Sequence, residues 1–143
     1  MNQEILNFLK DERIGVLAIE MLDGAPHAAT LHFAYDESSG MLFFKTSRSY
    51  RKSEPLFGRP TSRASFVVGV NESIMKSFQA DGEVRLITDD EKDLFERTFL
   101  GKFPEKKKTT PDPDAVFFVF IPTWWRYTDW TKPEGKVVIV SDQ

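Results

Sequence analysis

The chain contains no cysteine, which excludes disulfides, thiol catalysis and cysteine-based zinc sites. It also has no excess of positive charge, since its formal net charge is −3, and this argues against a dedicated nucleic-acid-binding protein. Long apolar runs are missing as well: the longest, AVFFVFI at 115–121, is too short to cross a bilayer. The N-terminus lacks the pattern of a signal peptide. We therefore expect a cytoplasmic protein with neither membrane nor nucleic-acid partners.

The composition is that of a globular protein. Of the 143 residues 41% are hydrophobic, 29% are charged and 13 are Phe. A chain of this length and composition buries a real core, so we expect one domain spanning residues 1–143.

Short alternating segments separated by turn residues dominate the chain. Seven or eight such strands, with helices at the junctions, predict a mainly β protein built as a small antiparallel barrel. Consecutive strands are too close for helical crossovers. The expected strands are 15–22, 26–35, 41–46, 62–70, 76–87, 115–121 and one or both of 124–130 and 136–141; the expected helices are 3–12, 50–57 and 88–99.

Local signals mark several of these boundaries. Asp23-Gly24 is a hairpin turn signal, and Gly82 suggests a bulge within the strand 76–87. Thr88 and Glu91 have the spacing of a capping box. The segment 101–114 reads as a loop, and the charge run Lys106–Lys108 within it is typical of a solvated surface.

The sequence gives little support for a metal site or for a catalytic nucleophile. The only histidines, His27 and His32, fall on opposite faces of one expected strand and so cannot act as paired ligands. No nucleophile elbow is present. We predict no metal site, and the pattern identifies no catalytic residue.

The stretch FFKTSRSYRKSEPL, 43–56, gathers hydroxyls and positive charge at the end of a strand. It is either a solvated loop or a phosphate socket, in which the hydroxyls donate hydrogen bonds and the start of a helix adds amide donors. The candidate groups are Ser47, Ser49, Ser53, Arg48, Arg51 and Lys52. The glycines of a nucleoside-triphosphatase loop are absent.

Two further segments suit a planar ligand. The small residues Ala28, Ala29 and Thr30 would let a ring lie close to the backbone, or they relieve crowding in a narrow barrel. The aromatic segment TWWRYTDW, 123–130, could stack on a ring, or it forms core or a dimer interface.

These segments, in this order and spacing, resemble the FMN-binding split-barrel family related to pyridoxamine 5'-phosphate oxidase. The likeness covers GVLAIEMLDGAPHAATLHFAYD, MLFFKTSRSYRKSEPL, RASFVVGV and FQADGEVRLITDDE, and so nearly the whole chain. It implies a six-stranded antiparallel split barrel that forms a homodimer with flavin mononucleotide (FMN) at the subunit interface.

The resemblance also implies site residues. Along the flavin ring and ribityl chain would lie Thr30, Leu31, His32, Phe44, Lys45 and Thr46. Arg51 and Lys52 would grip the phosphate, helped by Ser47 or Ser53. Gln79 and Trp125 would approach the flavin, from the same subunit or from the partner.

The implied function is an FMN-dependent oxidoreductase that uses a small-molecule electron donor or acceptor. The arginines and histidine that read pyridoxal phosphate near the C-terminus of a true oxidase are not clearly present, so we do not expect a vitamin B6 substrate. Two alternatives stay open: a non-enzymatic flavin-binding or stress-related protein, and a barrel that binds a deazaflavin or heme.

Overall fold

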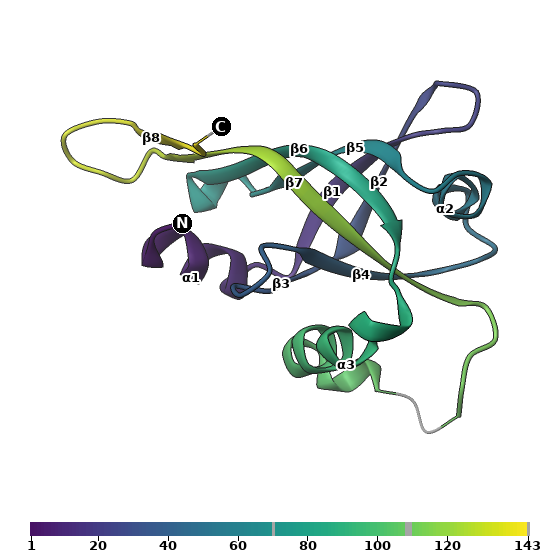
Figure 1. Cartoon of the computed structure of the whole chain (residues 1–143). Coiled ribbons are helices and arrows are strands. Elements are labelled where there is room, and N and C mark those ends of the chain that lie inside the picture. Colours follow the sequence, from purple (N-terminus) through teal and green to yellow (C-terminus); the bar gives the residue numbers. More distant parts are fainter. Residues whose placement is uncertain (70, 108–109, 143) are drawn as a thin grey trace.

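The strands form one curled antiparallel sheet. The computed structural model describes residues 1–69, 71–107 and 110–142. The sheet order is β2-β1-β5-β6-β7-β4-β3, with β8 paired to β7 (Figure 1). The strands are β1 (Ile14–Glu20), β2 (Pro26–His32), β3 (Ala34–Tyr35), β4 (Leu42–Ser47), β5 (Ser62–Val68), β6 (Lys76–Leu86), β7 (Ala115–Asp129) and β8 (Val137–Val140).

The sheet closes on itself because one interrupted strand supplies both of its edges. β2 and β3 are separated by Phe33 alone; β2 pairs with β1, whereas β3 pairs with β4. The predicted split barrel is confirmed. The structure has eight strand segments where the resemblance implied six strands, because the second strand is broken and β8 extends the end of β7.

Helices lie at the junctions, as predicted. α1 (Gln3–Asp11) begins at Asn2, whose side chain accepts a hydrogen bond from Ile5 N. The expected helix 50–57 is a short pair of elements, and 88–99 is an irregular series that ends in a π-helical turn. The remaining elements are η1 (Arg51–Ser53), α2 (Glu54–Gly58), η2 (Glu72–Ile74), η3 (Asp89–Glu91), α3 (Lys92–Phe95), η4 (Glu96–Leu100) and η5 (Pro104–Lys106).

Aromatic rings fill the barrel. Phe66 contacts both Phe33 and Phe44 edge to face, with 5.2 Å between ring centroids in each pair, and Phe44 stacks on Phe118 at 5.0 Å. A second cluster lies between the sheet and the helical series from α3, where Phe43 meets Phe95. Because β4 buries both of its faces, its apolar residues run without alternation.

One expectation about the last strands was wrong. The expected strand 115–121 and all but the last residue of 124–130 belong to a single strand, β7, which runs through Pro122 and ends at Asp129. Proline is tolerated there because the pairing with β6 shifts register between Asp81 and Gly82, and this confirms the predicted bulge. A Cβ on Gly82 would lie 2.1 Å from Ile121 O, so the bulge requires glycine. Val70, which was expected to end β5, lies outside the described residues.

The predicted capping box forms and is extended by an ion pair. Glu91 accepts from Thr88 N at 2.9 Å and from both terminal nitrogens of Arg85 at 2.7 and 2.8 Å. Chiefly the hydrogen bonds from Arg85 lower the pKa of Glu91 from 4.5 to about 2.

Glu91→Gln is therefore expected to lower the free energy of unfolding by about 1–3 kcal/mol at pH 7. A carboxylate with a depressed folded pKa stabilises the fold above its unfolded pKa, and this contribution is lost as the pH falls from 4.5 through about 2. The difference between variant and parent in urea unfolding should thus shrink between pH 5 and pH 3. An equal difference at both pH values would contradict the assignment.

Candidate functional site

The break in the barrel leaves a seam between β2 and β4. Phe33 N donates to Arg13 O, and hydrogen-bonded pairs alternate along an antiparallel ladder. The backbone N–H and C=O groups of Thr30 and His32 therefore point away from β1. On that side β2 lies beside β4 and η1. The seam thus presents backbone donors and acceptors to whatever occupies it.

Residues of β2 alternate between the barrel interior and its outer face. Leu31 is buried in the core cluster, and His27 shares its side of the strand. Ala28 and Thr30 are exposed on the outer face, and His32 follows them half-buried. Two of the three small residues that the sequence singled out, Ala28 and Thr30, therefore line an open surface where a planar group could approach the backbone, whereas Ala29 lies half-buried on the side of Leu31.

β4 carries the predicted ring and ribityl residues on two sides. Phe44 and Thr46 are buried toward the barrel, whereas Lys45 and Ser47 are half-buried on the opposite face. The Thr46 hydroxyl is buried and has no hydrogen-bond partner among the residues that the structure describes. Such a group costs about 1–3 kcal/mol unless something bonds to it. It is a ready hydrogen-bonding group for a ligand in the seam.

The basic loop after β4 is held rigidly. The buried Ser53 hydroxyl lies 2.9 Å from Arg48 O and 2.7 Å from Tyr50 O, and so fixes the turn that starts η1. Arg48 stacks over the ring of Phe57 at 4.2 Å. Ser53 is therefore committed to the loop itself.

Arg51 and Lys52 occupy the first turn of η1, beside β2. Arg51 is exposed, whereas Lys52 is half-buried with its ammonium 4.5 Å from the Tyr50 ring centroid. Burial lowers the pKa of Lys52. Within the described residues, neither side chain forms an ion pair with a carboxylate. The two cations are thus available to an anion at this end of the seam.

His32 sits among groups that keep its imidazole neutral. Its ring meets that of Phe103 edge to face, with 5.2 Å between the centroids. Burial, with the charges of Lys106 and Arg13, lowers the pKa of His32 below 6.5. At neutral pH it offers a hydrogen-bonding ring rather than a charge. Sequence reasoning missed Phe103 and Lys106 as neighbours of His32, since they lie about 70 residues away along the chain and no local pattern links them.

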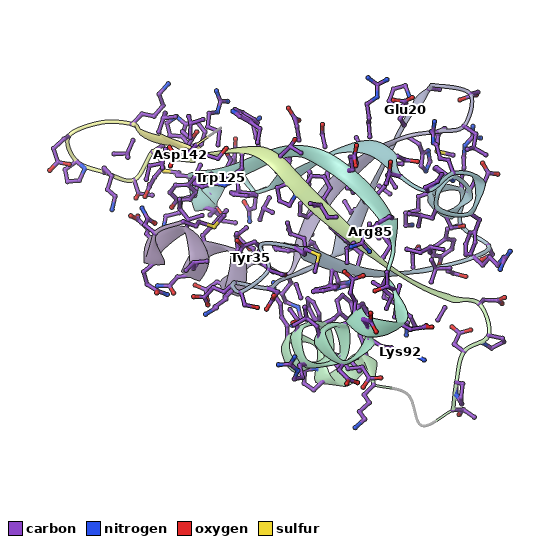
Figure 2. All side chains as sticks on the ribbon, in the orientation of Figure 1. Glu20, Tyr35, Arg85, Lys92, Trp125 and Asp142 are labelled. Carbon is purple, nitrogen blue, oxygen red and sulfur yellow. The ribbon has the colours of Figure 1, made fainter. Side chains whose placement is uncertain are left out.

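Gln79 and Trp125 lie away from the seam. The register places Thr30, Val16, Val67 and Gln79 in one row across four strands, so Thr30 and Gln79 are separated by three strand spacings, or about 14 Å along the sheet. Trp125 points to the other face of the sheet, where it stacks on Phe78 at 5.9 Å, at the β8 end of the barrel (Figure 2).

The row that contains Thr30 and Gln79 continues across the outer face into the C-terminal strands β7 and β8. Gln79 accepts a hydrogen bond of 2.7 Å from Arg126, which is paired in register with Val140 of β8. Gln79 is therefore oriented toward the outer surface by a partner from β7. A single chain brings together the β2, β4 and η1 residues but leaves Gln79 and Trp125 apart from them.

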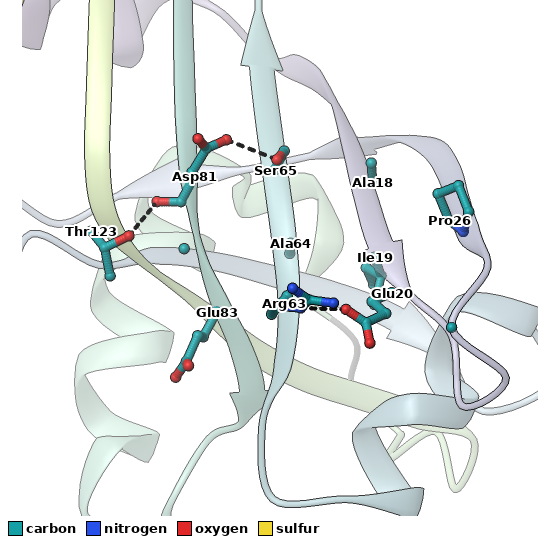
Figure 3. Close-up of a pocket in the computed structure, with 12 residues that line it drawn as sticks. Ala18, Ile19, Glu20, Pro26, Arg63, Ala64, Ser65, Asp81, Glu83 and Thr123 are labelled. Carbon is teal, nitrogen blue, oxygen red and sulfur yellow. Dashed lines mark hydrogen bonds and ion pairs between the residues drawn. The ribbon is translucent and has the colours of Figure 1, made fainter.

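The outer face also carries a hollow of about 570 Å³, which Figure 3 shows. Its polar groups are the ion pair Glu20–Arg63, the Asp81–Ser65 hydrogen bond of 2.9 Å, and Glu83. Carboxylates outnumber cations here, so this hollow does not suit a phosphate. The structure offers the better anion site at η1.

Comparison with known proteins places these features in a family. The sequence model of pyridoxamine 5'-phosphate oxidase matches residues 1–129. Among curated proteins, no sequence matches the chain significantly. No helix in the described part of the chain is both long and apolar enough to span a membrane.

Solved structures share the fold at low identity. A pyridoxamine 5'-phosphate oxidase-related, FMN-binding protein from Nostoc punctiforme is 16% identical with a TM-score of 0.65, over 98% of this chain and 96% of its own. A Clostridium acetobutylicum protein related to general stress protein 26 is 16% identical, with a TM-score of 0.63 over 95% and 91%. A heme-binding protein from Mycobacterium smegmatis is 14% identical, with a TM-score of 0.70 over 94% and 55%. The split barrel and the match over residues 1–129 agree: the chain belongs to the pyridoxamine 5'-phosphate oxidase family.

Proposed function

We propose that this protein binds FMN in the seam between β2 and β4 and acts as an FMN-dependent oxidoreductase. The observation that carries the proposal is that Arg51 and Lys52 in η1 form no ion pair within the described residues. Both lie beside the strand edge where Thr30 and His32 present their backbone groups. The similarity to an FMN-binding protein supports the choice of ligand. A strand edge that presents backbone groups beside small side chains and positive charge suits a flat ring with a terminal phosphate.

In this proposal each part of the seam has one task. Arg51 and Lys52 hold the phosphate, and the Thr46 hydroxyl supplies a hydrogen bond to the ribityl chain or ring. Lys45 lies on the outer face of β4 beside the seam, while Phe44 and Leu31 pack in the barrel core and hold the two adjoining strands in place. When bound, FMN would supply the hydride and electron transfer, while the protein orients the ring and excludes water. The neutral imidazole of His32 would form a hydrogen bond to the flavin ring and so influence its electronic properties.

We further propose that the site is completed in a homodimer. Gln79 lies three strands from Thr30, about 14 Å along the sheet of one chain, so both reach one ring only if the second copy supplies Gln79. The outer face between Thr30 and Gln79 carries Val16 and Val67, which are half-buried, and the exposed Val140 lies farther along the same row, beyond Gln79. An apolar row of this kind suits burial against another barrel.

Val67→Glu is expected to give a monomer. An unpaired charge costs several kcal/mol to bury, so the dimer dissociation constant should rise at least about 100-fold. Sedimentation measures the change, with Gln3→Glu on the exposed face of α1 as the control of equal charge. The monomer should also lose FMN, and a monomer that keeps full FMN affinity would contradict an interfacial site.

Turnover separates an oxidoreductase from a flavin carrier. We expect the FMN-loaded protein to be reduced by a nicotinamide nucleotide or another small donor and reoxidised by an acceptor, followed at the flavin absorbance maximum. FMN that stays bound but unreactive toward a panel of donors would favour the flavin-binding alternative. The similarity to a heme-binding protein supports heme as the second candidate ligand, and its Soret band distinguishes it from flavin or deazaflavin.

A further inference from the structure

A separate pocket of about 660 Å³ lies between the helical series that follows β6 and the outer faces of β4 and β7. Its size falls in the range of small-molecule sites. The helical series forms one wall and the start of β7 the other; α3 and β4 mark its place in Figure 1. Among the described residues, the lining comes from Lys45, Ile87, Lys92, Phe95, Glu96, Arg97, Leu100, Gly101, Pro104, Lys106, Lys107, Thr110, Pro111, Asp112, Ala115 and Phe117.

Its floor is apolar. Phe117 of β7 lies half-buried on the outer face of the sheet, and Phe95 of α3 meets it with 4.7 Å between the ring centroids. Leu100, partly buried, packs against the same cluster. Both rings, which are tilted by 52° to each other, line the pocket, and such an apolar floor suits contact with a flat or aliphatic body.

Positive charge surrounds this floor. Lys92 and Arg97 come from the helical series and Lys106 from η5, and in the part of the chain that is described none of the three has a carboxylate within ion-pair distance. The lining holds two acidic residues, Glu96 and Asp112, against a larger number of cations. Unpaired cations beside an apolar floor are an arrangement that an amphipathic anion would satisfy.

The wall of the pocket is an irregular helix. Residues 96–100 form a π-helical turn, which is rare and frequently found at functional sites. The turn places Arg97 and Leu100 together on the pocket lining. The expectation that Lys106–Lys108 is a solvated run is corrected in part, because Lys106 is half-buried and lines the pocket; Lys108 lies outside the described residues.

We propose that this pocket is a second binding site, for a small amphipathic anion: a flat or aliphatic apolar body that carries one carboxylate, sulfonate or phosphate. The body lies on Phe95, Phe117 and Leu100, and the anionic group lies among Lys92, Arg97 and Lys106. Apart from Lys45, no residue assigned to the flavin lines it. The proposal therefore stands independently of FMN binding.

The test uses two probes that share one body. Anilinonaphthalene sulfonate carries the anionic group, and N-phenyl-1-naphthylamine lacks it. Fluorescence titration of the full chain should give one saturable site per chain, with the sulfonate bound at least about tenfold more tightly. Equal affinity for the two probes would overturn the proposal, because the cations would then contribute nothing.

Variants locate the site. The double substitution Arg97→Gln, Lys106→Gln should weaken the sulfonate about tenfold and leave the neutral probe unchanged. Lys136→Gln, an exposed cation on the β7–β8 hairpin, is the control and should change neither. Circular dichroism checks that every variant is folded. The proposal is overturned if the double variant binds the sulfonate normally.

A final arm separates this pocket from the seam. Arg51→Gln, Lys52→Gln should leave sulfonate binding unchanged, as should excess FMN. Loss of sulfonate binding in that variant would place the probe at the phosphate socket and would contradict a second site. If FMN itself fails to bind, the proposed function fails, while sulfonate binding that depends on Arg97 and Lys106 would still support the pocket.

Discussion

The double substitution Arg51→Ala, Lys52→Ala is expected to raise the dissociation constant for FMN at least about 100-fold. Each charge-assisted hydrogen bond to the phosphate contributes about 1.5–3 kcal/mol, so loss of both removes at least about 3 kcal/mol. Ser53 holds the loop through Arg48 O and Tyr50 O, and the contact of Lys52 with the Tyr50 ring adds to this. The fold should survive, and flavin fluorescence titration measures the loss.

Riboflavin provides the matched ligand for this experiment. It has the ring and ribityl chain without the phosphate, so the double variant and the parent should have the same dissociation constant for riboflavin. Lys10→Ala, Lys136→Ala removes the same charge from exposed positions and should keep FMN affinity. Equal losses for FMN and riboflavin would mean that the substitutions disturb the ring and ribityl site itself, and would contradict a phosphate socket.

Phe66→Ala is expected to lower the free energy of unfolding by about 3–5 kcal/mol. Phe66 is fully buried and its ring touches those of Phe33, Phe44 and Phe120. Truncation leaves a cavity at the centre of the barrel that these rigid rings fill only partly. Urea unfolding at pH 7 gives the difference directly.

Phe57→Ala is the control for the core. Phe57 is 45% exposed and carries the Arg48 side chain over its ring, so its loss should cost about 1 kcal/mol or less. A loss at Phe66 no larger than that at Phe57 would show that the aromatic cluster does not hold the barrel together. FMN affinity should fall only as far as the folded fraction of Phe66→Ala falls.

Local signals in the sequence were sufficient for most of the fold. The Thr88–Glu91 capping box and the bulge at Gly82 depend on residues close in the chain, and each was found where predicted. The continuous strand through Pro122 could not be predicted this way. Proline normally ends a strand, and only the register shift against β6, a tertiary feature, makes room for it.

The candidate site likewise has some features that local sequence predicts and others that depend on the tertiary structure. The charge and hydroxyls of 46–53 are visible as a local cluster, and the structure keeps them together beside β2. The distance between Thr30 and Gln79 depends on the sheet order, in which β1 and β5 lie between their strands. The pocket at Phe95 and Phe117 is formed by segments that are distant in the sequence and share no pattern. From the sequence alone, Lys106 is therefore interpreted as part of a solvated charge run.

The most direct test of the account is an absorbance spectrum of the purified protein after incubation with FMN and gel filtration. We predict that the flavin bands elute with the protein at one FMN per chain and disappear in Arg51→Ala, Lys52→Ala. A spectrum without flavin bands, or one that shows only the Soret band of heme, would contradict FMN binding at the seam and leave the split barrel without its proposed cofactor.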